Sequence, residues 1–181
     1  MEPIEVSDTR PISAEKILVL LPCRGGHWHH LVNRVKAGRI ARLPPIVIAM
    51  IFARSARACG VERLVLCYLK AKRFHEEQEK DIRAIIAALE NFGIETVTLR
   101  LDSMESPKNK TTTMPLEDYA VAPLAIFPGR LTKTCYSVLE GIPVGPLLVE
   151  GFDIVLEWAY KVAKEHYEDQ LFTFEWHSLA L

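Results

Sequence analysis

The sequence predicts an α/β fold with an open parallel sheet flanked by helices. Short apolar runs rich in Ile, Leu and Val alternate with segments of helical character, and this alternation is typical of strands joined by helical crossovers. Crossovers of this length make consecutive strands parallel and their connections right-handed. The 181 residues suit one core, so we expect a single domain over residues 1–181.

Four segments are predicted to be strands of this sheet. Residues 16–21 form a short run of Ile, Leu and Val that stops at a proline and a glycine pair, as a buried strand would. Residues 63–69 and 96–101 are the second and third strands in the chain. A fourth, shorter strand is expected over 124–127.

Two helices are predicted between these strands. Pro44 and Pro45 suit the first turn of a helix, which ends near Cys59 with Gly60 as its C-terminal cap. The second helix ends near Gly93. Its apolar residues recur at the spacing of one helical face, and they are Ile82, Ile85, Ile86 and Leu89.

The second half of the chain is less regular. Residues 103–146 are predicted to be an irregular or inserted segment, because they are rich in polar residues, Gly and Pro. An amphipathic helix is expected over 147–167. Residues 171–176 then alternate in polarity and predict a last strand, antiparallel at the edge of the sheet.

Charge is distributed unevenly along the chain. The formal net charge is −1, yet no acidic residue occurs between Glu15 and Glu62, which leaves a basic block over 24–57. The four cysteines form no CxxC pair and have no zinc-type spacing, so reduced thiols are expected. The N-terminus does not have the pattern of a signal peptide, and no apolar stretch is long enough for a bilayer. We therefore expect a cytoplasmic protein.

Two basic loops follow the first two predicted strands. Ligands of open α/β sheets bind at the carboxyl ends of the strands, near the point where strand order reverses. We expect the two loops to lie side by side at that edge and to grip a phosphate-rich ligand such as a linear or cyclic nucleotide. The expected ligand-binding residues are Arg24, Gly25 and Gly26 in the first loop, and Lys70, Lys72 and Arg73 in the second.

Two further segments contain residues that could contact a ligand or act in catalysis. Residues 127–134 form a Gly-containing turn that includes Thr132 and Lys133 and resembles a phosphate-contacting turn, although it does not have the spacing of a Walker motif. Residues 27–30 hold three histidines, of which His27 is the candidate acid–base group. A catalytic zinc needs three protein ligands, and adjacent residues seldom reach one ion. No metal and no other cofactor is therefore assigned.

The segments 17–26, 61–69, 79–81 and 93–99 together resemble the CRISPR-associated Rossmann-fold, or CARF, domain family. The resemblance covers about the first hundred residues. It implies a Rossmann-like domain and a homodimer that binds a cyclic oligoadenylate in antiviral defence, and that in some members cleaves this ligand without metal as a ring nuclease. By position, it implies that Arg24, Gly25 and Gly26 contact the ligand, together with Thr132 and Lys133 of the later turn.

The hypothesis from sequence is thus a nucleotide-binding protein of CARF type, acting as a sensor or as a phosphodiesterase of the ring nuclease kind. In the second case Lys133 and His27 would be the catalytic residues, because cations stabilise the charge of a pentacoordinate phosphate. Two alternatives stay open. One is an RNA-binding module that uses the basic surface over 24–57. The other is a metal-dependent hydrolase that uses the loop 27–30.

Overall fold

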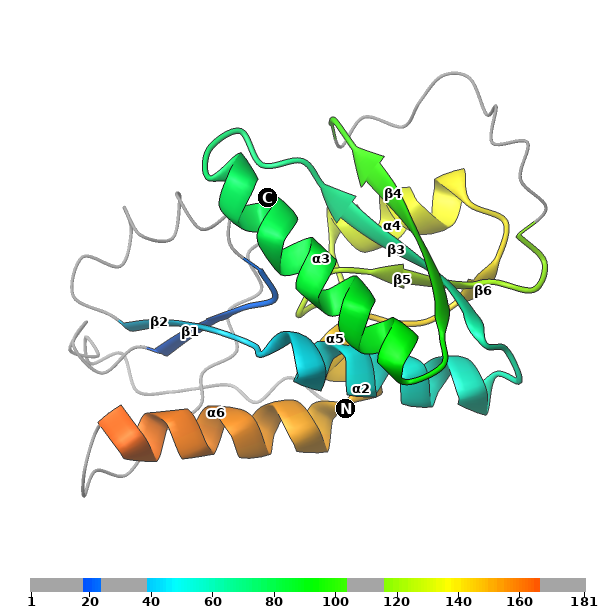
Figure 1. Cartoon of the computed structure of the whole chain (residues 1–181). Helices are drawn as coiled ribbons and strands as arrows, with labels where there is room; N and C mark the ends of the chain where they lie inside the picture. Colours follow the sequence, from blue (N-terminus) through cyan, green and yellow to red (C-terminus); the bar gives the residue numbers. More distant parts are fainter. Residues whose placement is uncertain (1–17, 24–38, 104–115, 167–181) are drawn as a thin grey trace, which may run out of the picture.

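The computed structural model describes residues 18–23, 39–103 and 116–166 (Figure 1). At its centre lies a four-stranded sheet in which every neighbouring pair is parallel. Its spatial order is β4-β3-β5-β6, which confirms the predicted open parallel sheet flanked by helices. The strands are β3 (Arg63–Leu69), β4 (Glu95–Leu101), β5 (Ala120–Pro123) and β6 (Ile142–Pro143).

The central strand β3 explains why the sheet has two apolar faces. Alternate side chains of a strand point to opposite faces. Leu64 and Leu66 belong to the cluster under one pair of helices, whereas Val65 and Cys67 belong to the cluster on the other face. A strand buried on both sides must be apolar throughout, and for this reason its bounds agree with those predicted from sequence.

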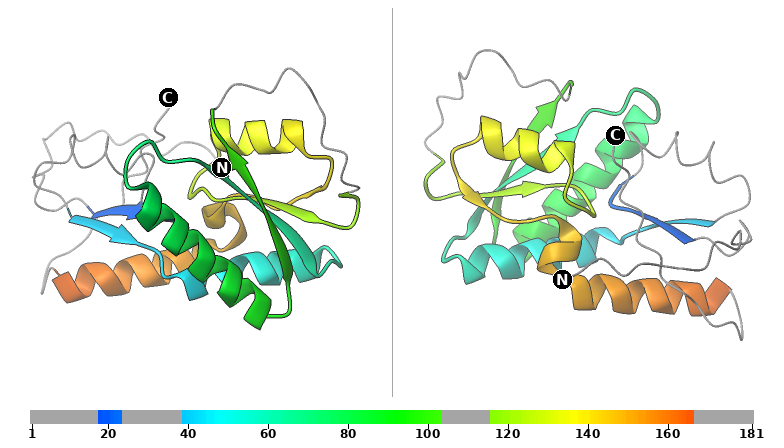
Figure 2. Two further views of the ribbon diagram at one scale, coloured as in Figure 1. Left: turned by 45° about the horizontal axis from the view of Figure 1, so that its top comes forward. Right: turned by 180° about the vertical axis from the view of Figure 1, so that it is seen from behind.

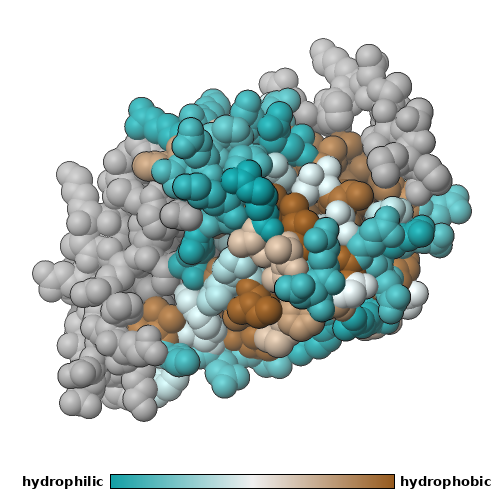
Figure 3. Space-filling model, in the orientation of Figure 1, coloured by the Kyte–Doolittle hydropathy of each residue, from teal (hydrophilic) through white to brown (hydrophobic). Residues whose placement is uncertain are grey.

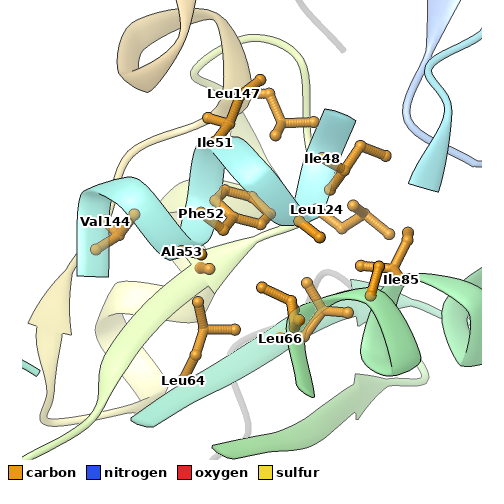
Figure 4. Packing of buried hydrophobic residues seen from close by; sticks show 14 of the residues in the cluster. Ile48, Ile51, Phe52, Ala53, Leu64, Leu66, Ile85, Leu124, Val144 and Leu147 are labelled. Carbon is orange, nitrogen blue, oxygen red and sulfur yellow. The ribbon is translucent and has the colours of Figure 1, made fainter. Parts of the chain in front are cut away.

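Helices cover both faces of the sheet. α2 (Pro45–Ala58) and α3 (His75–Asn91) lie on one face and α4 (Arg130–Val138) on the other, as the turned views of Figure 2 show. Phe52 of α2 is fully buried and packs in the same cluster as Leu64 and Leu66 of β3 (Figure 4). Burial of one such aromatic side chain stabilises the fold by about 1.5–3 kcal/mol.

The first predicted strand lies outside the four-stranded sheet. β1 (Leu18–Leu21) pairs in parallel with β2 (Arg39–Arg42), and the two form a sheet of their own. The expectation that 16–21 and 63–69 are strands of one sheet is therefore wrong. β2 was not predicted, because its four residues include two arginines and form no apolar run.

The second half differs from the prediction in three places. The strand expected at 124–127 lies four residues earlier, as β5, whose Ala-Val-Ala-Pro sequence carries little strand signal although all four residues are buried. Within 103–146 the structure describes β5, α4 and β6. The long helix is divided at Gly151 into α5 (Leu147–Glu150) and α6 (Phe152–His166), and a Cβ at Gly151 would lie 2.7 Å from a side-chain carbon of Ile51.

The strand expected at 171–176 lies outside the described residues. In the part of the chain that is described, no helix has both the length and the apolar character that a membrane span requires. The cytoplasmic location, the single domain and the homodimer stay predictions.

Candidate functional site

The order of the strands defines one edge of the sheet as the candidate site. Taken in chain order, the four strands occupy the spatial order 2-1-3-4, so the direction of winding reverses between β3 and β5. Ligands of doubly wound sheets bind in the crevice outside the carboxyl ends of the strands at such a reversal. The two segments that leave these ends are 70–74, which leads into α3, and 124–129, which leads into α4 (Figures 1 and 2).

The loop 70–74 is held in place by a buried side chain of the helix that follows it. The backbone N–H of Ala71 donates a hydrogen bond of 2.8 Å to Oε1 of Gln78, and Nε2 of Gln78 donates one of 2.8 Å to the carbonyl oxygen of Leu69. The N–H of Lys70 donates to the carbonyl oxygen of Leu101 at 2.8 Å. The loop therefore has a defined shape, with Lys70 and Lys72 exposed on it.

These lysines border an open hollow of about 530 Å³, lined by Lys70, Ala71, Lys72, His75 and Asp102. Asp102 is the one acidic residue of this lining, and its Oδ1 lies 4.0 Å from Nε of Arg100, whose charge offsets it. The surface over the first half of α3 and the loop before it is hydrophilic (Figure 3). This hollow is the cationic part of the candidate site.

A polar network lies behind the hollow. The hydroxyl of Tyr68 donates a hydrogen bond of 3.0 Å to Oε1 of Glu79, and Nδ1 of His75 lies 3.9 Å from the same oxygen. Burial of Tyr68, and then its hydrogen bond to Glu79, raise the pKa of the phenol to about 12. Tyr68 therefore stays neutral and acts as a donor that fixes Glu79 beside His75.

The turn before His75 has an unusual backbone. Phe74 has φ 56° and ψ 37°, the left-handed conformation, and it is the one described residue other than glycine with positive φ. A bulky residue in this region is rare because its Cβ crowds the backbone. Phe74 is nevertheless 46% exposed.

The other side of the site is the start of α4. Gly129 precedes the helix in an extended conformation, and no side chain caps the helix. Phe127, 36% exposed, lies on the segment that leads to it. Thr132 is buried, and its Oγ1 has no hydrogen-bond partner among the described residues, whereas Lys133 is exposed.

The end of β1 also approaches the loop 70–74. Cys23 lies beside Gln78 and Asp81, and burial, followed by the charge of Asp81, raises the pKa of its thiol to about 12. Arg42 of β2 forms an ion pair with Asp81 of α3. The pair β1–β2 is therefore joined to the candidate site through α3, although it is not a part of the main sheet.

The structure describes only some of the predicted site residues. Lys70, Lys72, Arg73 and Thr132 lie at the edge defined by the reversal, and Lys133 is in the first turns of α4; their roles in binding stay predictions. Arg24, Gly25, Gly26 and His27 lie outside the described residues.

Sequence reasoning missed Gln78. The available signal was a polar residue on the apolar face of α3, in line with Ile82 and Ile85. Within 18–23, 39–103 and 116–166, no group of three or more His, Cys, Asp or Glu side chains is arranged to hold a metal ion.

The sheet order and the two loops define a doubly wound α/β fold, and within that class two solved structures resemble the chain. The first is CbiX, described as the terminal enzyme for biosynthesis of siroheme in denitrifying bacteria. It has 17% identity and a TM-score of 0.56, over 82% of this chain and 76% of CbiX. The second is the sirohydrochlorin chelatase SirB from Bacillus subtilis subspecies spizizenii in complex with cobalt, with 18% identity and a TM-score of 0.46, over 84% of this chain and 68% of SirB.

At these identities the likeness to CbiX establishes the fold alone. No protein-family model matches the chain. No curated protein matches it either.

These findings correct the functional hypothesis. The expectation of a CARF-type nucleotide sensor or ring nuclease acting on cyclic oligoadenylate is wrong, because CbiX, which shares the fold, is described as an enzyme of siroheme biosynthesis. A phosphate-rich nucleotide as the ligand is wrong for the same reason. The likeness to CbiX gives no support to the RNA-binding and hydrolase alternatives. The CARF resemblance itself stays a prediction.

Proposed function

We propose that this protein binds a carboxylate-rich tetrapyrrole of the siroheme type at the carboxyl edge of the sheet, between the loop 70–74 and the start of α4. The observation that carries the proposal is the pair of exposed lysines, Lys70 and Lys72, on a hollow at the strand-order reversal of a fold similar to that of CbiX. The proposal concerns binding and assigns no residue to metal insertion.

The chemistry of the ligand suits this edge. Siroheme is an iron tetrapyrrole whose ring carries acetate and propionate groups, so it combines a flat apolar surface with many negative charges. Lys70 and Lys72 can pair with these carboxylates. Because one exposed ion pair contributes only about 0.2–1 kcal/mol, several such contacts are needed together.

Each of the two loops also offers an exposed aromatic ring. Phe74 precedes α3 and Phe127 precedes α4, and the two residues are 46% and 36% exposed. Rings of this kind supply apolar area for a flat macrocycle at a low cost in side-chain entropy. Lysines on the hollow, together with exposed phenylalanines on the segments before α3 and α4, suit a planar polyanion better than a small, compact anion.

The test is a titration of the protein with uroporphyrin I, a stable porphyrin with two carboxylates on every pyrrole ring. We expect saturable binding, seen as a shift of the porphyrin absorbance, that weakens as salt rises. Affinity should fall for coproporphyrin I, which carries half as many carboxylates. The double variant Lys70→Ala with Lys72→Ala should bind about three- to tenfold more weakly, because two exposed ion pairs are lost.

Lys161→Ala is the matched control, because Lys161 is an exposed lysine of α6 away from both loops. It should bind like the wild-type protein. Failure of the wild-type protein to bind uroporphyrin, or equal affinities of the double variant and the control, would contradict the proposal.

A further inference from the structure

The first N–H groups of α4 are not capped by any side chain of the described residues. The first N–H groups of any helix find no partner within the helix, and a Ser, Thr, Asp or Asn side chain usually caps them. Here the preceding residue is Gly129, which has no side chain, and no cap hydrogen bond is formed. The N–H of Lys133 is the first that bonds within the helix, to the carbonyl oxygen of Gly129 at 3.1 Å.

Thr132 adds an independent donor to this turn. Its residue is 6% exposed, and Oγ1 is buried without a hydrogen-bond partner among the described residues. Cα–Cβ bonds of a helix tilt toward its N-terminus, so the hydroxyl of the third helical residue is directed back over the uncapped turn. Buried hydroxyls in folded proteins are nearly always satisfied, whereas this one has no partner in the part of the chain that the structure describes.

The charges around the turn favour an anion. The first turn of α4 contains no acidic residue, and both Arg130 and Lys133 are exposed next to it. α3 differs, because Glu76 and Glu77 in its own first turn complement its dipole. α2 differs too, because it begins with prolines, which lack the N–H donor.

We propose that the N-terminus of α4 is a carboxylate-binding subsite, in which the N–H groups of residues 130–132 and the hydroxyl of Thr132 hold one side-chain carboxylate of the tetrapyrrole. The subsite rests on the proposed function for the identity of its ligand. It lies across the strand-order reversal from Lys70 and Lys72, so one macrocycle is held by charge on one side and by directed hydrogen bonds on the other.

Two variants of Thr132 separate the hydroxyl from the shape of the side chain. Thr132→Val removes the hydroxyl and keeps the volume, and we expect it to weaken the binding of uroporphyrin I by about tenfold or more, as for a hydrogen bond to a charged group. Thr132→Ser keeps the hydroxyl and should bind within about threefold of wild type. Equal binding by wild type and Thr132→Val would overturn the subsite and leave the proposed function standing.

Thermal unfolding of the free proteins provides a second readout. If the hydroxyl of Thr132 forms a hydrogen bond only with a ligand, its removal costs no stability in the ligand-free protein. The melting temperature of Thr132→Val should then equal or exceed that of wild type. A lower melting temperature for Thr132→Val than for Thr132→Ser would mean that the hydroxyl is satisfied inside the protein. That result would overturn the subsite whatever the binding data show.

Citrate distinguishes failure of the subsite from failure of the proposed function. It is a carboxylate unrelated to tetrapyrroles, and a ligand that binds only the folded state raises the melting temperature. A rise with citrate that Thr132→Val loses would support the subsite even if uroporphyrin does not bind, and only the proposed function would then be wrong. Absence of both effects in the wild-type protein would overturn both.

Discussion

The amide oxygen of Gln78 accepts a hydrogen bond of 2.8 Å from the backbone N–H of Ala71, so the helix α3 fixes the loop that precedes it. The same side chain donates to the carbonyl oxygen of Leu69, where β3 ends. Gln78 is 3% exposed, and therefore water cannot replace these two bonds. The shape of the loop that carries Lys70 and Lys72 depends on this residue.

Gln78→Met should destabilise the protein and loosen this loop. Methionine has a similar length, but it leaves a buried N–H and a buried carbonyl oxygen unsatisfied, at a combined cost of about 2–4 kcal/mol. Urea unfolding measures this loss. Lys80→Met, at an exposed position of the same helix, is the control and should change stability by less than about 0.5 kcal/mol. Similar stabilities of the two variants would show that the bonds of Gln78 do not hold the loop.

Stability should fall at high pH because of Tyr68. Its pKa is raised to about 12 in the folded protein, against about 10 for an unfolded chain, so above pH 10 the folded state binds more protons than the unfolded state. The stabilisation is fully present below about pH 10 and is lost as the pH rises toward about 12, with a slope of up to about 1.4 kcal/mol per pH unit. Tyr68→Phe should reduce this slope, measured by urea unfolding at several pH values. An unchanged slope would contradict the assignment to Tyr68.

Thiol labelling should distinguish one cysteine from the other three. Cys59 is exposed, whereas Cys23, Cys67 and Cys135 are buried. Contact with Cys135, and then burial, raise the pKa of the Cys67 thiol. Since the thiolate is the reactive form, a maleimide should label Cys59 rapidly in the folded protein and the others only on unfolding. In Cys59→Ser fast labelling should disappear, and rapid labelling of that variant would contradict the described burial.

Gly141→Ala should destabilise the fold far more than Gly129→Ala. A Cβ at Gly141 would lie 2.6 Å from Cγ2 of Val121 and 2.9 Å from the carbonyl oxygen of Tyr119, and the backbone of Tyr119, which directly precedes β5, cannot move aside easily. We expect a loss of about 3 kcal/mol in the free energy of unfolding. A Cβ at Gly129 meets nothing within 4 Å, so that variant should lose less than about 1 kcal/mol. Equal losses would show that the packing around Gly141 is looser than described.

The elements that the sequence predicts well are those in which one burial pattern extends over the whole length. β3 is buried on both faces, and α3 has an apolar stripe at regular spacing, so each shows its pattern over its whole length. β2 and β5 are short and depend on partners distant in the chain, and no local pattern marks them. The separation of β1 from the main sheet is likewise a property of long-range pairing and is not encoded locally.

The sequence predicted two loops at one edge of the sheet; the loop 70–74 lies at the strand-order reversal, whereas β1, the strand before the other loop, lies outside the main sheet. Lysines and glycines after strands indicate a negative charge on the ligand, since cations and backbone donors bind carboxylate and phosphate alike. A nucleotide and a tetrapyrrole with acetate groups are therefore not distinguished by Lys70, Lys72 or Thr132. The tetrapyrrole is therefore a proposal, and it rests on the fold likeness to CbiX.

The left-handed backbone of Phe74 bears on why that residue occurs there. Asparagine adopts this conformation with less strain and leaves the turn intact, so the turn could be made equally well without a phenyl ring. A bulky residue keeps a left-handed backbone conformation only where the surrounding structure enforces it, and such residues cluster at active sites and ligand-binding sites. A phenylalanine at position 74 therefore lowers the stability of the fold relative to an asparagine, while it places a phenyl ring at the surface.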